Sequence, residues 1–109
     1  METTIKEQDG KLFAFFNGRL DTSSASQVEK DIKPLTDCTG HDIVLDCTDM
    51  SYISSSGLRI FLGVLKNAKG KGSKVFVKGL TPDVEKIFKM TGFINLFERF
   101  EKKEKEQED

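Results

Sequence analysis

The sequence predicts an α/β fold, in which a mixed β-sheet of four to five strands has three to four helices packed against it. Short apolar runs that suit strands alternate with longer segments whose apolar residues recur every three or four positions, as in helices. The pair Asp9-Gly10 also divides the first apolar stretch, and both residues tolerate the positive φ of a tight hairpin turn. The 109 residues suit one domain, expected at residues 1–100, with a charged C-terminal tail at residues 101–109.

The N-terminal part is expected to form an antiparallel hairpin and then a helix. Residues 3–7 and 12–17 would supply the two strands. Asp21, Thr22 and Ser23 are favoured N-cap types for the helix. Its inner face carries apolar residues spaced three, four and three positions apart, namely Ala25, Val28, Ile32 and Leu35. Pro34 should end or kink this helix near residue 32 or 33, and residues 36–41 are expected to form a loop.

The middle of the chain predicts a buried strand, a loop and a long helix. Residues 42–47 contain a continuous apolar run that is too short for a helix. Residues 48–55 are polar and are expected to form a loop. The helix that follows carries an apolar stripe at i, i+3, i+4 and i+7, formed by Leu58, Phe61, Leu62 and Leu65. Gly70 or Gly72 is expected to close it.

The last third predicts one more strand and one more helix. Residues 75–77 form a short apolar strand. Thr81 is a suitable N-cap and Pro82 a suitable first helical residue. Gly92 should end the helix, and residues 94–100 are candidates for a final strand. Strand–helix–strand units imply right-handed crossovers and parallel pairing, so the hairpin adds the antiparallel pair at the edge.

Composition narrows the class of protein. Lys and Arg number 17 against 18 Asp and Glu, so the basic surplus expected of a nucleic-acid-binding chain is absent and no direct nucleic-acid partner is expected. Cys38 and Cys47 fit no CxxC spacing and are interpreted as reduced thiols. The N-terminus does not resemble a signal peptide, and no apolar run approaches about 20 residues. We therefore expect a cytoplasmic protein without membrane insertion.

The most informative segment is DCTDMSYISSSGLR, at residues 46–59, where a strand leads into a helix start. Ser54, Ser55 and Ser56 arrive together at this start, where free N–H groups and the helix dipole favour negative charge. Capping needs only one of these serines, so two interpretations stay open: plain capping, or capping together with phosphorylation. A phosphate would add a charge of about −1.5 to −2. It would be tolerated by its own helix and would change what binds outside.

The segment DMSYISSSGLRIFLGVLK resembles the signature of STAS domains, the fold of bacterial anti-sigma factor antagonists. Upstream, NGRLD at residues 17–21 resembles the family's turn before the first helix. Downstream, TPDVEKIF and TG, at residues 81–88 and 91–92, resemble its last helix and following turn. The match runs from about residue 10 to residue 97. The family's usual Asp before the phosphoserine is Ser54 here, so the resemblance places the phosphoserine at Ser55, with Ser56 as second choice.

The resemblance implies a transcription regulator that acts by partner switching. The unmodified protein would bind an anti-sigma factor and release a sigma factor. The anti-sigma factor, a serine kinase of the GHKL type, would phosphorylate Ser55, and a PP2C-like phosphatase would reverse the modification. ATP would belong to the kinase, so the chain itself should need no cofactor. The expected partner-binding residues are Asp21, Thr22, Ser23, Ser54, Ser55, Ser56, Gly57, Leu58 and Arg59.

Two alternatives use the same fold. The chain would be either a soluble STAS subunit of a membrane complex, in lipid trafficking or transport, or a constitutive binding module that is never phosphorylated. The missing Asp at position 54 favours the latter, because a carboxylate there would help to position the phosphorylated serine.

Other chemistry is weakly supported. A catalytic Ser55 would need a base, and the single histidine, His41, is expected about 20 Å away, at the other end of a six-residue strand. An enzyme is therefore not expected. Asp21, Asp46 and Asp49 are interpreted as turn and loop residues and not as a metal site. The Gly70–Lys74 stretch ends a helix and lacks the P-loop spacing, so it is interpreted as a basic turn.

Overall fold

The computed structural model describes residues 1–37 and 41–100. Its elements begin with two strands and then alternate between helix and strand, as expected, except that two helices stand between β2 and β3. They are β1 (Glu2–Gln8), β2 (Lys11–Leu20), α1 (Thr22–Asp31), α2 (Lys33–Asp37), β3 (Asp42–Ile53), α3 (Ser55–Gly70), β4 (Val75–Lys78), α4 (Pro82–Thr91), the 3₁₀ turn η1 (Phe93–Asn95) and β5 (Glu98–Arg99). The expected tail, residues 101–109, lies outside the described residues.

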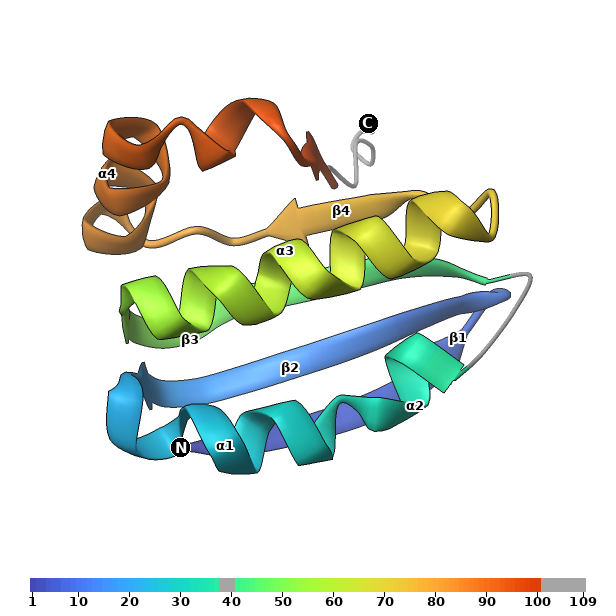
Figure 1. The fold of residues 1–109 in the computed structure, drawn as a ribbon, viewed down its shortest axis with the longest axis horizontal. Helices are drawn as coiled ribbons and strands as arrows, with labels where there is room; N and C mark the ends of the chain where they lie inside the picture. Colours follow the sequence, from blue (N-terminus) through green and yellow to red (C-terminus); the bar gives the residue numbers. More distant parts are fainter. Residues whose placement is uncertain (38–40, 101–109) are drawn as a thin grey trace, which may run out of the picture.

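The five strands form one mixed sheet in the order β1-β2-β3-β4-β5. β1 pairs antiparallel with β2, and the other three pairings are parallel. Asp9 and Gly10 both have positive φ, at 54° and 78°, which gives the tight turn between β1 and β2. Figure 1 shows α3 running along the central strands, with α1 and α2 beside it. The predicted mixed α/β fold is confirmed.

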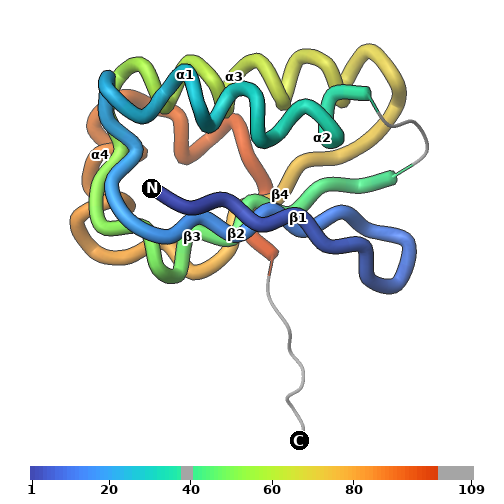
Figure 2. Tube along the Cα trace, turned by 90° about the horizontal axis from the view of Figure 1, so that it is seen from below, coloured from blue at the N-terminus to red at the C-terminus, as the bar shows by residue number. Residues whose placement is uncertain are grey.

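The helices α1, α2 and α3 lie on one side of the sheet, and Figure 2 shows the opposite side of the central strands without a helix. The core lies beneath these helices, because alternate residues of each strand point to the same face. In β2, for example, Leu12, Ala14 and Phe16 belong to the core. The fully buried rings of Phe16, Phe61 and Phe88 join the sheet to α3 and α4, with ring centroids 5.3 and 6.2 Å apart.

The loop expected at residues 48–55 is wrong, because β3 continues to Ile53. The continuation pairs with β2 across two register shifts, and it contains two buried residues, Met50 and Ile53, among exposed or half-buried ones. Asn17 pairs with Asp49 and Leu20 with Ile53, so both strands are much longer than predicted. The polar composition of residues 48–52 concealed the strand.

Pro34 interrupts the first helical segment, as predicted, but the chain continues as the short helix α2. The predicted loop at residues 36–41 is wrong for residues 36 and 37, which belong to α2, and residues 38–40 lie outside the described part. The last strand, expected at residues 94–100, is reduced to Glu98–Arg99 because Phe93–Asn95 form a 3₁₀ turn.

The buried face of α3 is rotated slightly from the predicted stripe. Leu58, Phe61 and Leu65 are buried as expected, but Leu62 is only half-buried. Val64 and Ala68 complete the buried face instead. Gly72, with φ of 76°, follows the end of the helix, and the Ser73 amide donates to the Ala68 carbonyl at 2.9 Å. Of the two glycines expected to close the helix, Gly72 is the one that does so.

Candidate functional site: two adjacent helix starts

Two helices begin side by side at one end of the sheet. Leu20, the last residue of β2, pairs with Ile53, the last residue of β3. Directly after this pair, the Ser54 amide donates to the Leu20 carbonyl at 2.8 Å. The N-cap residues of α1 and α3, Asp21 and Ser54, are therefore held at neighbouring strand ends.

Ser54 and Ser55 have different positions at the start of α3. Ser54 is the N-cap, and its hydroxyl accepts a hydrogen bond from the Gly57 amide at 3.2 Å. Ser55 is the first residue of the helix and is exposed, whereas Ser56 is half-buried. Because Ser54 already caps the helix, the exposed Ser55 side chain is not needed for capping.

Gly57 allows the start of α3 to lie directly on the strand ends. A Cβ atom there would stand 2.6 Å from the Leu20 Cγ and 2.8 Å from the Ile53 Cγ1. Leu58 is 4 % exposed and belongs to the core. Gly57 and Leu58 were both expected to contact a partner. They are buried, so they pack beneath the exposed residues at the start of α3. Arg59 is exposed one helical turn beyond Ser55.

Asp21 closes the start of α1 with a reciprocal pair of hydrogen bonds. The Ser24 amide donates to the Asp21 carboxylate at 3.1 Å, and the Asp21 amide donates to the Ser24 hydroxyl at 3.0 Å. The Ser23 hydroxyl also donates to this carboxylate at 2.8 Å. This Ser23 hydrogen bond is the main cause that lowers the pKa of Asp21, with smaller contributions from Ser24 and Arg19. Thr22 and Ser23 are exposed, so this helix start also faces outward.

Arg19 and Tyr52 also belong to the candidate site, although the sequence analysis did not identify them. These residues are register partners on β2 and β3, and the Arg19 guanidinium lies 4.5 Å from the centre of the Tyr52 ring. Arg19 also lies 3.7 Å from the Asp21 carboxylate. The extension of β2 and β3 brings these two residues opposite each other, so a sequence prediction of the longer strands would also have identified this contact.

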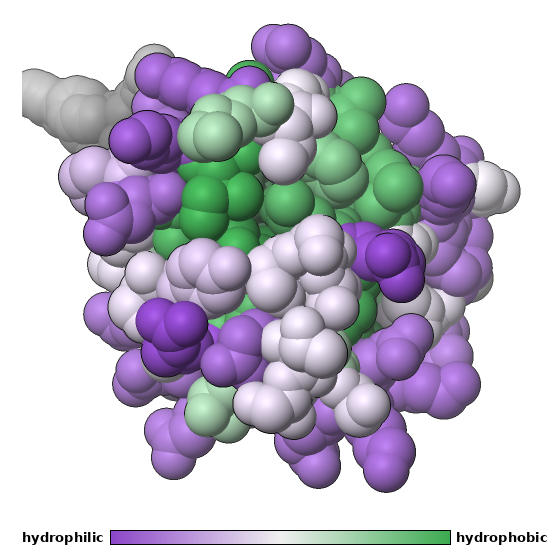
Figure 3. Space-filling model, turned by 60° about the vertical axis from the view of Figure 1, so that its left-hand side comes forward, coloured by the Kyte–Doolittle hydropathy of each residue, from purple (hydrophilic) through white to green (hydrophobic). Residues whose placement is uncertain are grey.

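A hydrophobic surface area lies at the same end of the molecule as the helix starts. Figure 3 brings forward the end of the molecule that carries α4 and the start of α3, and it shows a hydrophobic area beside a band of polar and neutral side chains. The partly buried apolar residues of α3, α4 and η1 are Ile60, Leu62, Ile87, Phe93 and Ile94. Met90, on α4, is 77 % exposed. A partner that docks at this end would therefore meet both polar and apolar groups.

His41 lies far from Ser55, and the candidate aspartates Asp21 and Asp46 are engaged by other groups. His41 precedes the first residue of β3 and Ser55 follows its last, so twelve strand residues separate them by roughly 40 Å, more than the sequence suggested. The His41 ring lies 3.2 Å from the Glu7 carboxylate. Asp46 pairs with Lys78 at 3.7 Å, whereas Asp21 caps α1. Residues 1–37 and 41–100 contain no group of three His, Cys, Asp or Glu side chains suited to a metal ion.

None of the helices in the described part of the chain is both long enough and apolar enough to span a bilayer.

Comparison with known proteins places the chain in a family. The family model described as "STAS domain" matches residues 2–107. The chain is 32 % identical over 97 residues to BtrV of Bordetella bronchiseptica, whose name assigns it to the anti-sigma factor antagonists; the match covers 89 % of this chain and 84 % of BtrV. It is 28 % identical over 95 residues to the anti-sigma-B factor antagonist of Listeria monocytogenes, covering 86 % of this chain and 83 % of that protein.

Among solved structures, the fold is similar to that of the Bacillus cell fate determinant SpoIIAA in its phosphorylated form. The TM-score is 0.70 at 17 % identity, and the match covers 96 % of this chain and 95 % of SpoIIAA. These relatives are named as regulators and not as enzymes. With its mixed five-stranded sheet and its two adjacent helix starts, the chain belongs to the STAS domain family and, within it, to the anti-sigma factor antagonists.

Proposed function

We propose that this protein binds an anti-sigma factor in the cytoplasm and thereby releases a sigma factor, and that phosphorylation of Ser55 ends the binding. The observation that carries the proposal is the position of Ser55. It is exposed at the first residue of α3, beside a second helix start, and it matches the family's phosphoserine in the sequence signature.

The geometry at Ser55 supports a modification that changes binding and leaves the fold intact. A phosphate at the first helical residue would lie by the positive end of the helix dipole, which favours it locally. The Ser54 cap would remain in place, because it uses a different side chain. The added bulk and charge, about −1.5 to −2, would therefore act on whatever contacts the two helix starts.

Serine in place of the family's aspartate at position 54 is compatible with this scheme. Aspartate and serine are both favoured N-cap residues, so the substitution keeps the cap and removes one negative charge beside Ser55. The phosphoryl donor would be ATP bound by the partner, a serine kinase of the GHKL type, and a PP2C-like phosphatase would reset the protein.

The test compares two variants of Ser55. Ser55→Ala should bind the purified anti-sigma factor as the parent does and should resist phosphorylation. Ser55→Asp should bind at least tenfold more weakly, although one carboxylate imitates a phosphate poorly. Asn67→Asp, which adds the same charge near the other end of α3, is the matched control and should bind like the parent. Calorimetry measures binding, and phosphopeptide mass spectrometry locates the phosphate.

Each alternative has its own outcome. If the kinase modifies Ser56 alone, the site is displaced by one residue and Ser56→Ala should be the resistant variant. If no serine is modified and Ser55→Asp binds like the parent, the chain is a constitutive binding module and phosphorylation control is refuted. If a pull-down from the native cell recovers transporter subunits and no anti-sigma factor, the role as soluble subunit of a membrane complex replaces the proposal.

A further inference from the structure

β1 is an edge strand whose outer side has no strand of the described chain beside it. Figure 2 is seen from this side and shows β1 in front of the other strands, with α1 and α2 above it. An edge strand exposes backbone N–H and C=O groups that can pair with a further strand. The opposite edge, β5, has two residues and β1 has seven, so β1 is the edge at which the sheet can be extended.

The two-residue turn before β2 determines which backbone groups of β1 point outward. Asp9-Gly10 joins Gln8 to Lys11, so these two residues form a hydrogen-bonded pair. Hydrogen-bonded and non-hydrogen-bonded pairs alternate along an antiparallel ladder, so residues 2, 4, 6 and 8 bond to β2. The backbone groups that point away from β2, and that no strand in the described part of the chain pairs with, are those of Thr3, Ile5 and Glu7.

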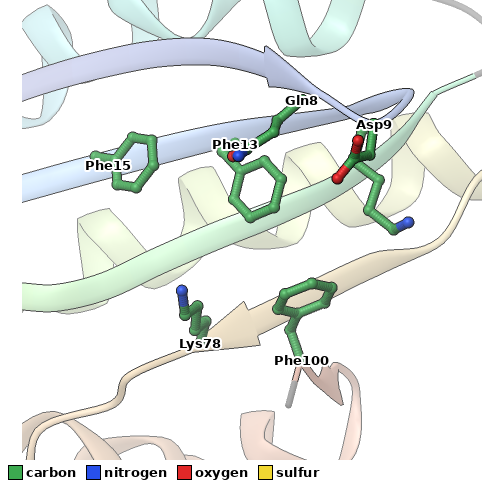
Figure 4. Close-up of a pocket in the computed structure, with 7 residues that line it drawn as sticks. Gln8, Asp9, Phe13, Phe15, Lys78 and Phe100 are labelled. Atoms are coloured by element: carbon green, nitrogen blue, oxygen red, sulfur yellow. The ribbon is translucent and has the colours of Figure 1, made fainter. Parts of the chain in front are cut away.

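The side chains of β1 carry opposite charges on one face of the sheet. Lys6 is the register partner of Phe13 on β2, so the two side chains lie on the same face. Figure 4 shows Phe13 on the face away from α3. Glu2 and Thr4 share this face with Lys6, because side chains alternate along a strand, and all three are exposed. Neither Glu2 nor Lys6 forms an ion pair within residues 1–37 and 41–100, so both charges are available to a neighbouring strand.

A second copy of β1 is complementary to this arrangement. Antiparallel pairing about a two-fold axis at Thr4 sets Glu2 of each copy opposite Lys6 of the other. The same axis sets Thr3 opposite Ile5, and both residues direct their backbone groups outward, so they form hydrogen-bonded pairs. One register therefore satisfies the backbone and pairs the charges.

Other registers of β1 against itself lack this agreement. An axis at Lys6 sets two ammonium groups opposite each other, which is unfavourable. An axis at Ile5 sets Lys6 opposite Thr4 and leaves the charges without opposite partners. An axis between two residues would set outward backbone groups opposite groups already bonded to β2. The axis at Thr4 is thus the symmetric one that sets a carboxylate of β1 opposite an ammonium.

We propose that this protein forms a symmetric homodimer in which the β1 strands of two copies pair antiparallel about Thr4 and join the two sheets. Charged residues often keep edge strands apart, but in this register the charges of β1 attract each other. Because each copy contributes a single strand, the dimer is weak, with a Kd on the order of 0.1–1 mM. The strand does not include Ser55, so the inference goes beyond the proposed function and does not depend on it.

Thr4→Cys tests the position of the axis. The Cα atoms of a non-hydrogen-bonded antiparallel pair are about 4.5 Å apart, within the range of about 4.4–6.8 Å that a disulfide spans. Oxidation of this variant at millimolar concentration should give a covalent dimer linked through position 4. Gln8→Cys, exposed on the same strand, is the matched control and should be linked at least tenfold more slowly, because the axis at Thr4 leaves nothing of β1 opposite it. Non-reducing electrophoresis measures the rate, and peptide mapping identifies the linked cysteine.

A charge exchange tests the pairing of Glu2 with Lys6. Glu2→Lys and Lys6→Glu should each weaken dimerisation about tenfold, because like charges then face each other twice. The double variant should restore the affinity of the parent. Glu29→Lys, an exposed position on α1, changes the net charge as Glu2→Lys does and should have no effect. Sedimentation equilibrium measures the Kd, and circular dichroism checks the fold.

The proposal predicts both results together. A parent that stays monomeric at millimolar concentration would overturn it. So would a dimer that Thr4→Cys fails to link, since the copies would then meet through another surface or register. Equal dimerisation of the parent, the single variants and the double variant would show that the charges do not face each other, and would overturn it as well.

Discussion

The hydroxyl of Ser54 accepts a hydrogen bond from the Gly57 amide at 3.2 Å, and this bond fixes the start of α3, where Ser55 is exposed. Ser54→Ala should lower the free energy of unfolding by about 1 kcal/mol, because one helix N–H loses its partner. Ser54→Asp should leave the free energy of unfolding unchanged or raise it by up to about 1 kcal/mol, because it keeps the cap and adds a favourable charge at the helix N-terminus. Urea unfolding measures both. Ser26→Ala, at an exposed position within α1, is the control and should cause no loss.

Gly57 and Gly63 provide a matched pair on α3. A Cβ at Gly57 would clash with the fully buried Leu20 and Ile53, so Gly57→Ala should destabilise by about 1–3 kcal/mol. A Cβ at Gly63 would meet nothing within 4 Å, so Gly63→Ala should stabilise by about 0.5–1 kcal/mol through helix propensity. A stabilised Gly57→Ala would show that α3 does not lie on the strand ends as described.

Phe61 and Leu62 test the orientation of α3 against the sheet. Phe61 is 0 % exposed and contacts the rings of Phe16, Phe88 and Phe97, so Phe61→Ala should cost about 3–5 kcal/mol. Leu62 is half-buried, so Leu62→Ala should cost clearly less than 2 kcal/mol. Chemical denaturation of both variants measures the two losses of unfolding free energy. Equal losses would contradict the orientation of α3 in which Phe61 is buried and Leu62 is half-buried.

Asp21 should make stability depend on pH at the acid end. Its pKa in the folded protein is lowered from 3.8, mainly by the Ser23 hydroxyl, so the unfolded chain binds protons first as the pH falls. This contribution is complete above the unfolded pKa and is lost as the pH falls through the folded one. Ser23→Ala should raise the Asp21 pKa and flatten the stability profile below about pH 4.5. Carboxyl NMR titration of both proteins follows the residue directly, and an unchanged pKa would remove the assigned cause.

The buried thiol of Cys47 should resist alkylation in the native protein. It is 0 % exposed, and burial, assisted by the nearby Asp46 carboxylate, raises its pKa far above the usual range. Cys38 lies outside the described residues. Native protein treated with iodoacetamide should therefore leave Cys47 unmodified, and denatured protein, without reductant, should be alkylated at both cysteines. Intact mass with peptide mapping measures this, and an internal disulfide would contradict the expectation of two reduced thiols.

Much of the fold followed from local sequence patterns. The Asp9-Gly10 turn, the Thr81-Pro82 helix start and the glycine that ends α4 are formed by neighbouring residues, so short-range rules were sufficient for them. The extension of β3 beyond Cys47 was not predictable in this way. Its pairing partners lie on β2, more than thirty residues earlier, and its composition is polar.

The residues of the candidate site could be predicted from the sequence, but their proximity in the fold could not. The serines and Asp21 were identified from helix-capping chemistry and family resemblance, and the structure brings both helix starts to one end of the sheet. Their proximity depends on the pairing of Leu20 with Ile53, which a predicted loop at residues 48–55 had hidden. The contacts of the Phe100 ring with the rings of Phe13 and Phe76 were missed for a related reason, because these residues come together only through parallel pairing.

The parallel centre of the sheet also bears on how fast the chain folds. Lys11 pairs with Asp42 and Ile43 with Val75, so each of these pairings must bring together residues about thirty positions apart in the sequence. The β1–β2 hairpin is local, and hairpins form within about 1–10 μs. Pairing of β2 with β3 must first offset the entropy of closing a long loop, so folding should take milliseconds or longer, well after the hairpin is complete.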